Sequence, residues 1–436
     1  MLARGSTSLS TAAVSKAAGG SRARRLLKLL DAIRNDGIRA TQVNRRLVYF
    51  CDWLPPDFGA VGQYAMLFAR QWAKEGWSVT LVGLTSRESG REAAEAIGKG
   101  ALEIIRVRRP TYAKQNLAKR LIWTIVSNLL LVRAALGAIR RADAVLFTGS
   151  PPLLLHFVAP LNLIIRAQLI YRITDFHPEC LIAERGRTDV LLSLLLRLTR
   201  FWRRRVHIFE VLGLDQARRL TEMGIQAERL CLKPDPSPVV FSPFLRPLPL
   251  PDGLGGGSGV ILYSGNWGIA HDENTFIEAY SEYIRQSPDG LRFWLNAVGS
   301  KADHVEDELR RRGITVFRSK TVALEQLPRL LLAADVHLIT LKDAFVGYVL
   351  PSKVHACIES GKRVIFVGSE DSDVHLLANR ALSASHYRRV KVGDAQGMVK
   401  ILHSMEEAIV AERHGMPAPR TTALTDGTAF AARAAY

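Results

Sequence analysis

The sequence predicts an α/β protein made of two doubly wound domains, and three observations support this. Short apolar runs rich in Val, Ile and Leu recur along the chain, separated by stretches with helical spacing. This alternation is typical of parallel sheets covered by helices on both faces. Pro and Gly crowd residues 234–259 and divide the alternation into two blocks. The chain has 436 residues, more than a single core usually organises, so two domains are expected.

Residues 1–44 are rich in Ser, Ala, Gly and Arg and contain no acidic residue before Asp31. They lack an apolar stretch of secretory length, so we expect a flexible basic extension, although the composition also fits an organelle transit peptide. The formal net charge of the chain is +18, which favours a polyanion or an anionic membrane surface as a neighbour. No recognised nucleic-acid-binding module accompanies this charge, so nucleic acid is not expected as a partner.

The four cysteines are scattered, with no CxxC pair and no local histidine cluster. This distribution argues for reduced thiols in the cytosol and against a zinc site.

The first domain is expected over residues 45–233. Its predicted strands are residues 46–52, 78–84, 103–107, 143–149, 168–175 and 206–213. The loop after the first strand contains Gly59 and Gly62, which permit close backbone approach where ligands meet a parallel sheet. Their GxxG spacing is not the dinucleotide fingerprint, and a rigid surface turn explains the loop equally well.

A second group of polar residues follows the strand at 168–175. Asp175, His177 and Glu179 leave the carboxyl end of this strand together. They are the candidates of this half for an acid, a base or a hydroxyl-binding group. Carboxylates are common in loops, so surface residues without a function remain the alternative.

Two helical regions, residues 114–141 and 189–205, combine leucine-rich runs with basic flanks and tryptophan. The runs are about 12 residues or fewer, short of the roughly 20 that cross a bilayer. Leu and Trp beside Arg favour binding at the surface of an anionic membrane. Core helices whose arginines reach solvent are the alternative.

The second domain is expected over residues 260–414, after a Pro/Gly-rich linker at 234–259. Its predicted strands are residues 260–268, 291–299, 314–318, 336–341 and 363–367. A late helix near 395–414 precedes residues 415–436, a tail that either crosses back to the first domain or stays loose.

A short predicted helix at residues 351–360 carries the main functional signal. Pro351 suits the first helical position, Ser352 suits a cap, and Gly361 suits the stop. Lys353 adds a full charge to the partial positive charge of the helix amino end, so an anion, most simply a nucleotide diphosphate, is the expected guest. An ordinary crossover helix with a solvated lysine is the alternative.

Six pieces carry a family resemblance: LPPDFGAVGQYA, TGSPPL, DFHPE, ILYSGNWGIAHDENTF, VGS and GYVLPSKVHACIESGKRVIFVG. In this order and spacing, residues 45–410 resemble the family 4 glycosyltransferases, especially the subgroup of colanic-acid, O-antigen and exopolysaccharide biosynthesis. The resemblance implies the GT-B fold, in which two Rossmann-like domains face each other across a cleft. It also implies retaining sugar transfer from a nucleotide-diphosphate sugar to a lipid-linked saccharide acceptor, without metal or cofactor, by a cytoplasmic enzyme peripheral on the inner membrane face.

The resemblance also implies roles for individual residues. Lys353 would stabilise the leaving nucleotide, and Asp175 and His177 are the other catalytic candidates. Gly59, Gly62 and Glu179 would line the acceptor side of the cleft. The donor-binding residues would be Ser264, Gly265, Asn266, Gly268, His271, Ser300, Lys320, Ser352 and Lys353.

The sequence departs from the family pattern at the Glu-x7-Glu motif, where it has Tyr348 and Ala356. His271 and Asp272 either bind sugar hydroxyls or cap the next helix. Residues 371–373 read Asp-Ser-Asp, which we interpret as a solvated acidic turn and not a metal motif. A sugar-nucleotide epimerase and a non-catalytic membrane- or polyanion-binding scaffold of the same fold are the alternative functions.

Overall fold

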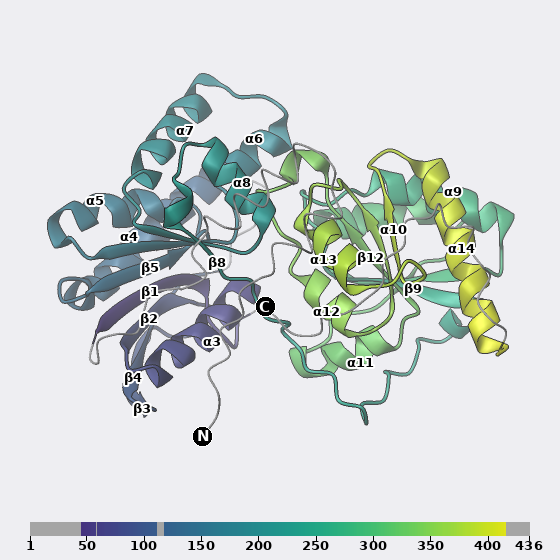
Figure 1. Cartoon of the computed structure of the whole chain (residues 1–436), viewed down its shortest axis with the longest axis horizontal. Helices are drawn as coiled ribbons and strands as arrows, with labels where there is room; N and C mark the ends of the chain where they lie inside the picture. Colours follow the sequence, from purple (N-terminus) through teal and green to yellow (C-terminus); the bar gives the residue numbers. More distant parts are fainter. Residues whose placement is uncertain (1–44, 58, 111–116, 416–436) are drawn as a thin grey trace, which may run out of the picture.

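The computed structural model describes residues 45–57, 59–110 and 117–415. It contains two sheets, each covered by helices on both faces, which confirms the predicted α/β class with two doubly wound domains. In Figure 1 the first domain lies on the left and the second on the right, with the linker running below the second. The predicted basic extension at 1–44 and most of the predicted tail lie outside the described residues.

The first sheet has eight strands in the order β3-β4-β2-β1-β5-β6-β7-β8, parallel except for β3. The strands are β1 (Arg46–Trp53), β2 (Ser78–Thr85), β3 (Gly90–Ile97), β4 (Gly100–Arg108), β5 (Ala144–Thr148), β6 (Gln168–Ile173), β7 (Ile208–Val211) and β8 (Leu230–Leu232). The helices are α3 (Ala60–Lys74), α4 (Leu117–Ile139), α5 (Leu155–Ile165), α6 (Glu179–Arg185), α7 (Val190–Arg203) and α8 (Leu214–Glu222). The sequence did not predict β3 because this edge strand is almost entirely exposed and lacks an apolar run.

Strand β1 shows why this sheet is buried on both faces. Leu47 and Tyr49 point toward α3, where they pack with Phe68. Val48 and Phe50 point to the opposite face and pack among the residues of another core. A strand that is apolar at every position from Leu47 to Cys51 therefore needs helices on both sides, as parallel sheets usually do.

The second sheet has six strands in the order β11-β10-β9-β12-β13-β14, and all of its pairs are parallel. The strands are β9 (Gly259–Asn266), β10 (Leu291–Val298), β11 (Phe317–Arg318), β12 (Val336–Thr340), β13 (Arg363–Val367) and β14 (Tyr387–Val390). The helices are α9 (Asn274–Gln286), α10 (Ser300–Arg311), α11 (Leu327–Leu332), α12 (Lys353–Glu359), α13 (Asp373–Ala381) and α14 (Ala395–Arg413). Strand β9 lies centrally, so its carboxyl end opens at the middle of the sheet edge.

Helix α4 lies within the predicted helical region 114–141, but its apolar character extends further than the short runs expected from the sequence. It continues for 23 residues and is the one helix in the described part of the chain that passes a membrane-span test of length and composition. Residues on one face of the helix are buried in the first domain at four-residue spacing: Ser127, Leu131, Ala135 and Ile139. In this structure α4 therefore serves as a covering helix of the sheet.

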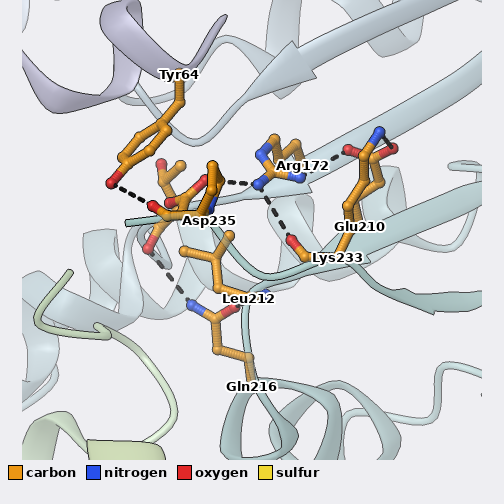
Figure 2. A network of polar contacts seen from close by, with 9 residues as sticks. Tyr64, Arg172, Glu210, Leu212, Gln216, Lys233 and Asp235 are labelled. Atoms are coloured by element: carbon orange, nitrogen blue, oxygen red, sulfur yellow. Dashed lines mark hydrogen bonds and ion pairs between the residues drawn. The ribbon is translucent and has the colours of Figure 1, made fainter. Parts of the chain in front are cut away.

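The segment between the domains is anchored at its start by a buried ionic network (Figure 2). The Arg172 guanidinium contacts Asp235 at 2.6 Å and Glu210 at 3.0 Å, and Lys233 contacts Glu210 at 3.1 Å. The hydroxyl of Tyr64 in α3 donates to the carbonyl of Pro236 at 3.1 Å. These contacts fix the beginning of the predicted linker to β6, β7 and α3.

The later part of the linker packs on the second domain. Val239 and Leu254 are buried against Trp294 of β10 and Leu330 of α11. The linker is therefore held at both ends although its sequence has no periodicity.

The two domains also touch where β6 ends. The backbone N–H of Phe176 donates to the carbonyl of Tyr348 at 3.2 Å, and Asp175 forms an isolated bridge with Val349. From α8, Arg219 Nε donates to the carbonyl of Val346 at 3.1 Å. The segment that leads into α12 is thus contacted by the first domain.

Candidate functional site

Lys353 begins α12, and its side chain reaches over the ring of Tyr263 in β9, with Nζ 3.2 Å from the ring centroid. The Nζ atom is buried and has no hydrogen-bond partner in the described structure. Burial lowers the pKa of this amine to about 7. Because an isolated buried ammonium is strongly unfavourable, the position suits an anion that would compensate the charge.

The helix around Lys353 differs from the prediction. It begins at Lys353 and not at Pro351, and it is seven residues long. Ser352 occupies the position directly before the helix, as predicted, but it has helical dihedral angles and its hydroxyl makes no capping bond. The lysine side chain, and not a long helix dipole, is therefore the main source of positive charge at this position.

The carboxyl end of β9 follows directly from Tyr263. Ser264 is buried at the end of the strand, and Gly265 has φ +102°, a conformation that side chains disfavour. Asn266 is exposed. A Cβ on Gly268 would meet Asn266 at 3.4 Å, a tight contact. Ser264, Gly265 and Asn266 are therefore the last residues of β9, still paired with β10, and Gly268 follows the strand; together they begin one residue beyond the ring that Lys353 contacts.

His271 lies in the same neighbourhood. Its Nδ1 is 2.6 Å from the carbonyl of Thr340, and since a carbonyl only accepts, Nδ1 carries the proton. Burial, reinforced by the nearby Lys353, lowers the pKa of His271 to about 3. Asp272 accepts from the backbone N–H of Thr275 at 3.2 Å and so caps α9. Of the two, His271 therefore belongs to the candidate site and Asp272 to the helix start.

Ser300 and Lys320 lie further along the same sheet edge. Ser300 begins α10 and is exposed, and Lys320 is exposed after β11. The side chain of Asn296 donates to the carbonyl of Lys320 at 2.6 Å, which ties that loop to β10. The structure shows no contact of either residue with Lys353, so their donor-binding role stays a prediction.

The first domain contributes a residue that the sequence analysis missed. Asp52, in β1, accepts from the hydroxyl of Ser150 at 2.7 Å. Burial raises the pKa of Asp52 to about 6; burial, and then the charge of Asp52, raise the pKa of Asp175 to about 6. The two carboxyls therefore lie near each other, at the ends of β1 and β6. The signal was present in the sequence, because both acids end an apolar strand pattern.

His177 and Glu179 follow Asp175 but differ in their environments. Burial, then the charge of Arg120, lower the pKa of His177 to about 4, so this imidazole is neutral near pH 7. The Glu179 carboxylate is buried and forms a two-point ion pair with Arg203, one contact being 2.9 Å. Arg203 thus occupies both carboxylate oxygens, and Glu179 holds α6 to α7 instead of facing the cleft as predicted.

The two glycines of the first loop also differ. A Cβ on Gly62 would lie 1.7 Å from the carbonyl oxygen of Trp53, whereas a Cβ on Gly59 would have only ordinary contacts, the nearest at 3.6 Å. The close approach that Gly62 permits is therefore to the protein's own β1 and not to a ligand.

We expect Gly62→Ala to destabilise the fold by roughly 1–3 kcal/mol, as overpacking does, because the backbone of α3 must move away from β1. Gly59→Ala is the matched control. Its φ of 175° is open to any residue, so we expect little change. Urea unfolding of both variants measures the difference, and equal stability of the two variants would contradict this reading of the loop.

The Asp-Ser-Asp sequence at 371–373 is not the solvated turn that was predicted. Ser372 caps α13, and Asp373 is buried against Asp215 of the first domain. Within the described residues, no group of three or more His, Cys, Asp or Glu side chains is placed to hold a metal ion.

Comparison with known proteins rests on structure alone. No protein-family model matches the sequence, and no curated protein shows significant sequence similarity to it. Among solved structures, the chain is similar to a trehalose 6-phosphate synthase from Burkholderia multivorans, with TM-score 0.56 and 13% identity, covering 86% of this chain and 91% of that one.

Two further structures are similar to the chain. The Anabaena protein HepE, solved in complex with UDP and glucose, matches with TM-score 0.53 and 13% identity, covering 85% of this chain and 94% of that one. The glycosyltransferase WaaG, involved in lipopolysaccharide biosynthesis, matches with TM-score 0.54 and 14% identity, covering 83% and 90%. These similarities confirm the GT-B fold; at such low identity they establish nothing about substrates.

Proposed function

We propose that this protein is a retaining, metal-independent glycosyltransferase that moves a sugar from a nucleotide-diphosphate sugar to a lipid-linked saccharide acceptor. The observation that carries the proposal is the buried Lys353 amine, which has no hydrogen-bond partner in the described structure and lies on the ring of Tyr263 near the carboxyl end of β9. A pathway for exopolysaccharide or O-antigen repeat units is the setting that the sequence resemblance suggests. The GT-B neighbours support glycosyl transfer in general.

Lys353 acts on the leaving group in this mechanism. When the bond between the sugar and the diphosphate breaks, negative charge grows on the departing phosphate. A cation fixed in a site with little water stabilises that charge more than it stabilises the bound donor, so it lowers the barrier. The segment from Ser264 to Gly268, together with Ser352, holds the diphosphate, and His271 accepts from a sugar hydroxyl through its unprotonated Nε2.

Asp52, Asp175 and His177 serve the acceptor side. With a pKa near 6, each aspartate is largely ionised at pH 7 and accepts a hydrogen bond from an acceptor hydroxyl. The neutral His177 is suited to the same task. Asp175 links the two halves of the site, since its backbone bridges to Val349, four residues before Lys353.

A membrane surface is the proposed location, because apolar side chains are exposed on three neighbouring helices. They are Leu121, Ile122, Ile125 and Leu129 of α4, Leu163 and Ile164 of α5, and Val190, Leu191, Leu194, Leu198 and Phe201 of α7. Helix α5 contacts both α4 and α7, so the three helices lie side by side in the first domain (Figure 1). Arginines on the same helices would meet anionic headgroups, and the four cysteines, which form no disulfide in the described residues, fit the cytoplasmic face of the membrane.

We expect the double variant Leu191→Glu/Leu194→Glu to lose binding to vesicles that contain anionic lipid, because it places charge on the proposed membrane face. The control is Val240→Glu/Phe244→Glu, which changes two highly exposed apolar residues of the linker instead. Co-sedimentation with vesicles measures both. Equal binding by the two double variants would contradict this location of the membrane face.

The lowered pKa of Lys353 predicts how donor binding depends on pH. Above pH 7 the free protein holds a neutral amine, while the bound diphosphate requires the ammonium, so binding takes up a proton. The affinity for a nucleoside diphosphate should fall about tenfold per pH unit above 7, until the raised pKa of the complex is reached. Calorimetry at pH 8 in buffers of different ionisation enthalpy measures the uptake, and binding without proton uptake would contradict this assignment.

The function itself is tested by mixing the protein with candidate nucleotide sugars and a lipid-linked saccharide, then following both substrates by NMR. The proposal predicts release of a nucleoside diphosphate only when the acceptor is present, with the anomeric configuration of the sugar retained. Conversion of a nucleotide sugar without acceptor would identify an epimerase. A complete lack of nucleoside-diphosphate binding would favour a scaffold.

A further inference from the structure

Two carboxyl groups meet across the boundary between the domains. Asp215 lies in the first turn of α8, Asp373 begins α13, and their side chains are 3% and 4% exposed. The backbone N–H of Asp215 donates to Oδ2 of Asp373 at 2.9 Å, and that of Asp373 donates to Oδ2 of Asp215 at 3.1 Å. Each carboxyl therefore caps the helix of the opposite domain.

The surrounding backbone fits tightly around this pair. A Cβ on Gly213 would lie 1.9 Å from Oδ2 of Asp373, and a Cβ on Gly347 would lie 2.7 Å from the carbonyl oxygen of Asp215. One glycine comes from each domain. Both positions lack room for a side chain, so the contact is a closely packed one in this arrangement of the domains.

If both groups of the pair are ionised, one buried carboxylate oxygen has no proton donor. Oδ1 of Asp215 is buried and has no hydrogen-bond partner, while burial and the charge of Asp215 raise the pKa of Asp373 well above its usual value. The charged groups on the surrounding elements have contacts of their own: Arg218 with Asp371, Arg219 with Glu222, Arg389 with Glu370, and His375 with Tyr387. Two ionised carboxyls in this position would repel each other strongly.

We propose that Asp215 and Asp373 share one proton and form a latch that holds the two domains together, and that losing this proton loosens the domain contact. When a contact raises the pKa of a group, the protonated group stabilises that contact fully at low pH. This stabilisation of the contact is lost as the pH rises through the raised pKa. The latch thus favours the closed arrangement below the raised pKa and domain opening above it.

The latch adjoins the segment that leads to Lys353. From α8, Arg219 donates to the carbonyl of Val346 at 3.1 Å, and its guanidinium lies 4.8 Å from the ring centroid of Tyr348. Loosening the contact between α8 and α13 would therefore also change how the first domain meets this segment. The latch stands on its own geometry and does not depend on the proposed sugar transfer.

The test measures the distance between the domains without any substrate. Spin labels are attached at Arg133→Cys in α4 and Asp307→Cys in α10, both exposed, while the four native cysteines are buried and escape labelling. Distance distributions by pulsed electron resonance are recorded between pH 5 and 9, with circular dichroism at each pH confirming that the fold is intact. We expect longer and broader distances as the pH rises.

The variants decide whether the pair is responsible. In Asp373→Asn the amide donates permanently to Asp215, so the short distance should persist at every pH, and Asp215→Asn should behave alike. Asp371→Asn, a neighbouring acid outside the pair, should keep the response of the unmodified protein. A distance that does not change with pH in the unmodified protein would overturn the proposal. So would asparagine variants whose distance increases with pH as much as it does in the unmodified protein.

Discussion

Replacing Lys353 by methionine should weaken nucleoside-diphosphate binding by roughly ten- to a hundredfold, the worth of a hydrogen bond to a charged group. The rate of sugar transfer should fall further, by about a hundred- to a thousandfold, because the charge that Lys353 stabilises is largest in the transition state. Methionine keeps most of the side-chain volume over the Tyr263 ring. Calorimetry measures the binding and a coupled assay for the released diphosphate measures the rate.

The stability of the same variant separates this role from a structural one. A buried amine with no hydrogen-bond partner costs more in lost hydration than its contact with the Tyr263 ring returns, so Lys353→Met should unfold at the same temperature as the unmodified protein, or a higher one. Lys362→Met, which removes a lysine just beyond α12, is the control and should leave binding unchanged. Loss of diphosphate binding accompanied by a large fall in melting temperature would point to a structural lysine.

Replacing Arg172 by leucine should destabilise the first domain by about 3–5 kcal/mol, the usual effect of removing one partner from a buried ion pair. Glu210 and Asp235 would remain buried, and only Glu210 would retain a cation, Lys233. The guanidinium also lies 4.4 Å from the ring centroid of Phe68 in α3, a contact that leucine replaces only in part. Urea unfolding followed by circular dichroism measures the loss.

Arg185→Leu is the matched control for Arg172→Leu. Arg185 pairs with Asp189 at 3.3 Å, but the pair is exposed on the surface. Such pairs contribute about 0–1 kcal/mol, so the control should change little. If both arginine variants lost the same small amount, the network of Figure 2 would not be what fixes the start of the linker.

The sequence predicted the parts of the fold that depend on local patterns. Central strands such as β1 and β12 are mainly apolar and almost fully buried, and a parallel sheet buried on both faces requires such strands. The helix stop at Gly361 follows from its φ of +69°, which glycine adopts without strain. Lys353 was singled out from the sequence because it stands at a helix start that follows a buried strand; the structure buries its amine, and its role in binding stays a prediction.

The sequence did not predict features that arise from contacts between distant segments. Nothing near Gly62 shows that the carbonyl of Trp53 fills the space beside it. Asp373 looked solvated because its neighbours are acidic, yet Asp215, 158 residues away, buries it. In the same way, the carboxylate of Glu179 forms a buried ion pair with Arg203 instead of facing the cleft. These contacts depend on tertiary packing, and no pattern in the local sequence indicates them.

The most direct test of the central claim is a crystal structure with the nucleoside diphosphate that binds most tightly. Our account predicts a diphosphate oxygen within about 3.2 Å of Lys353 Nζ, the range of a charge-assisted hydrogen bond. The same phosphate should lie against the segment from Ser264 to Gly268, at the carboxyl end of β9. A diphosphate bound elsewhere, with Nζ still on the ring of Tyr263 and no phosphate contact, would contradict it.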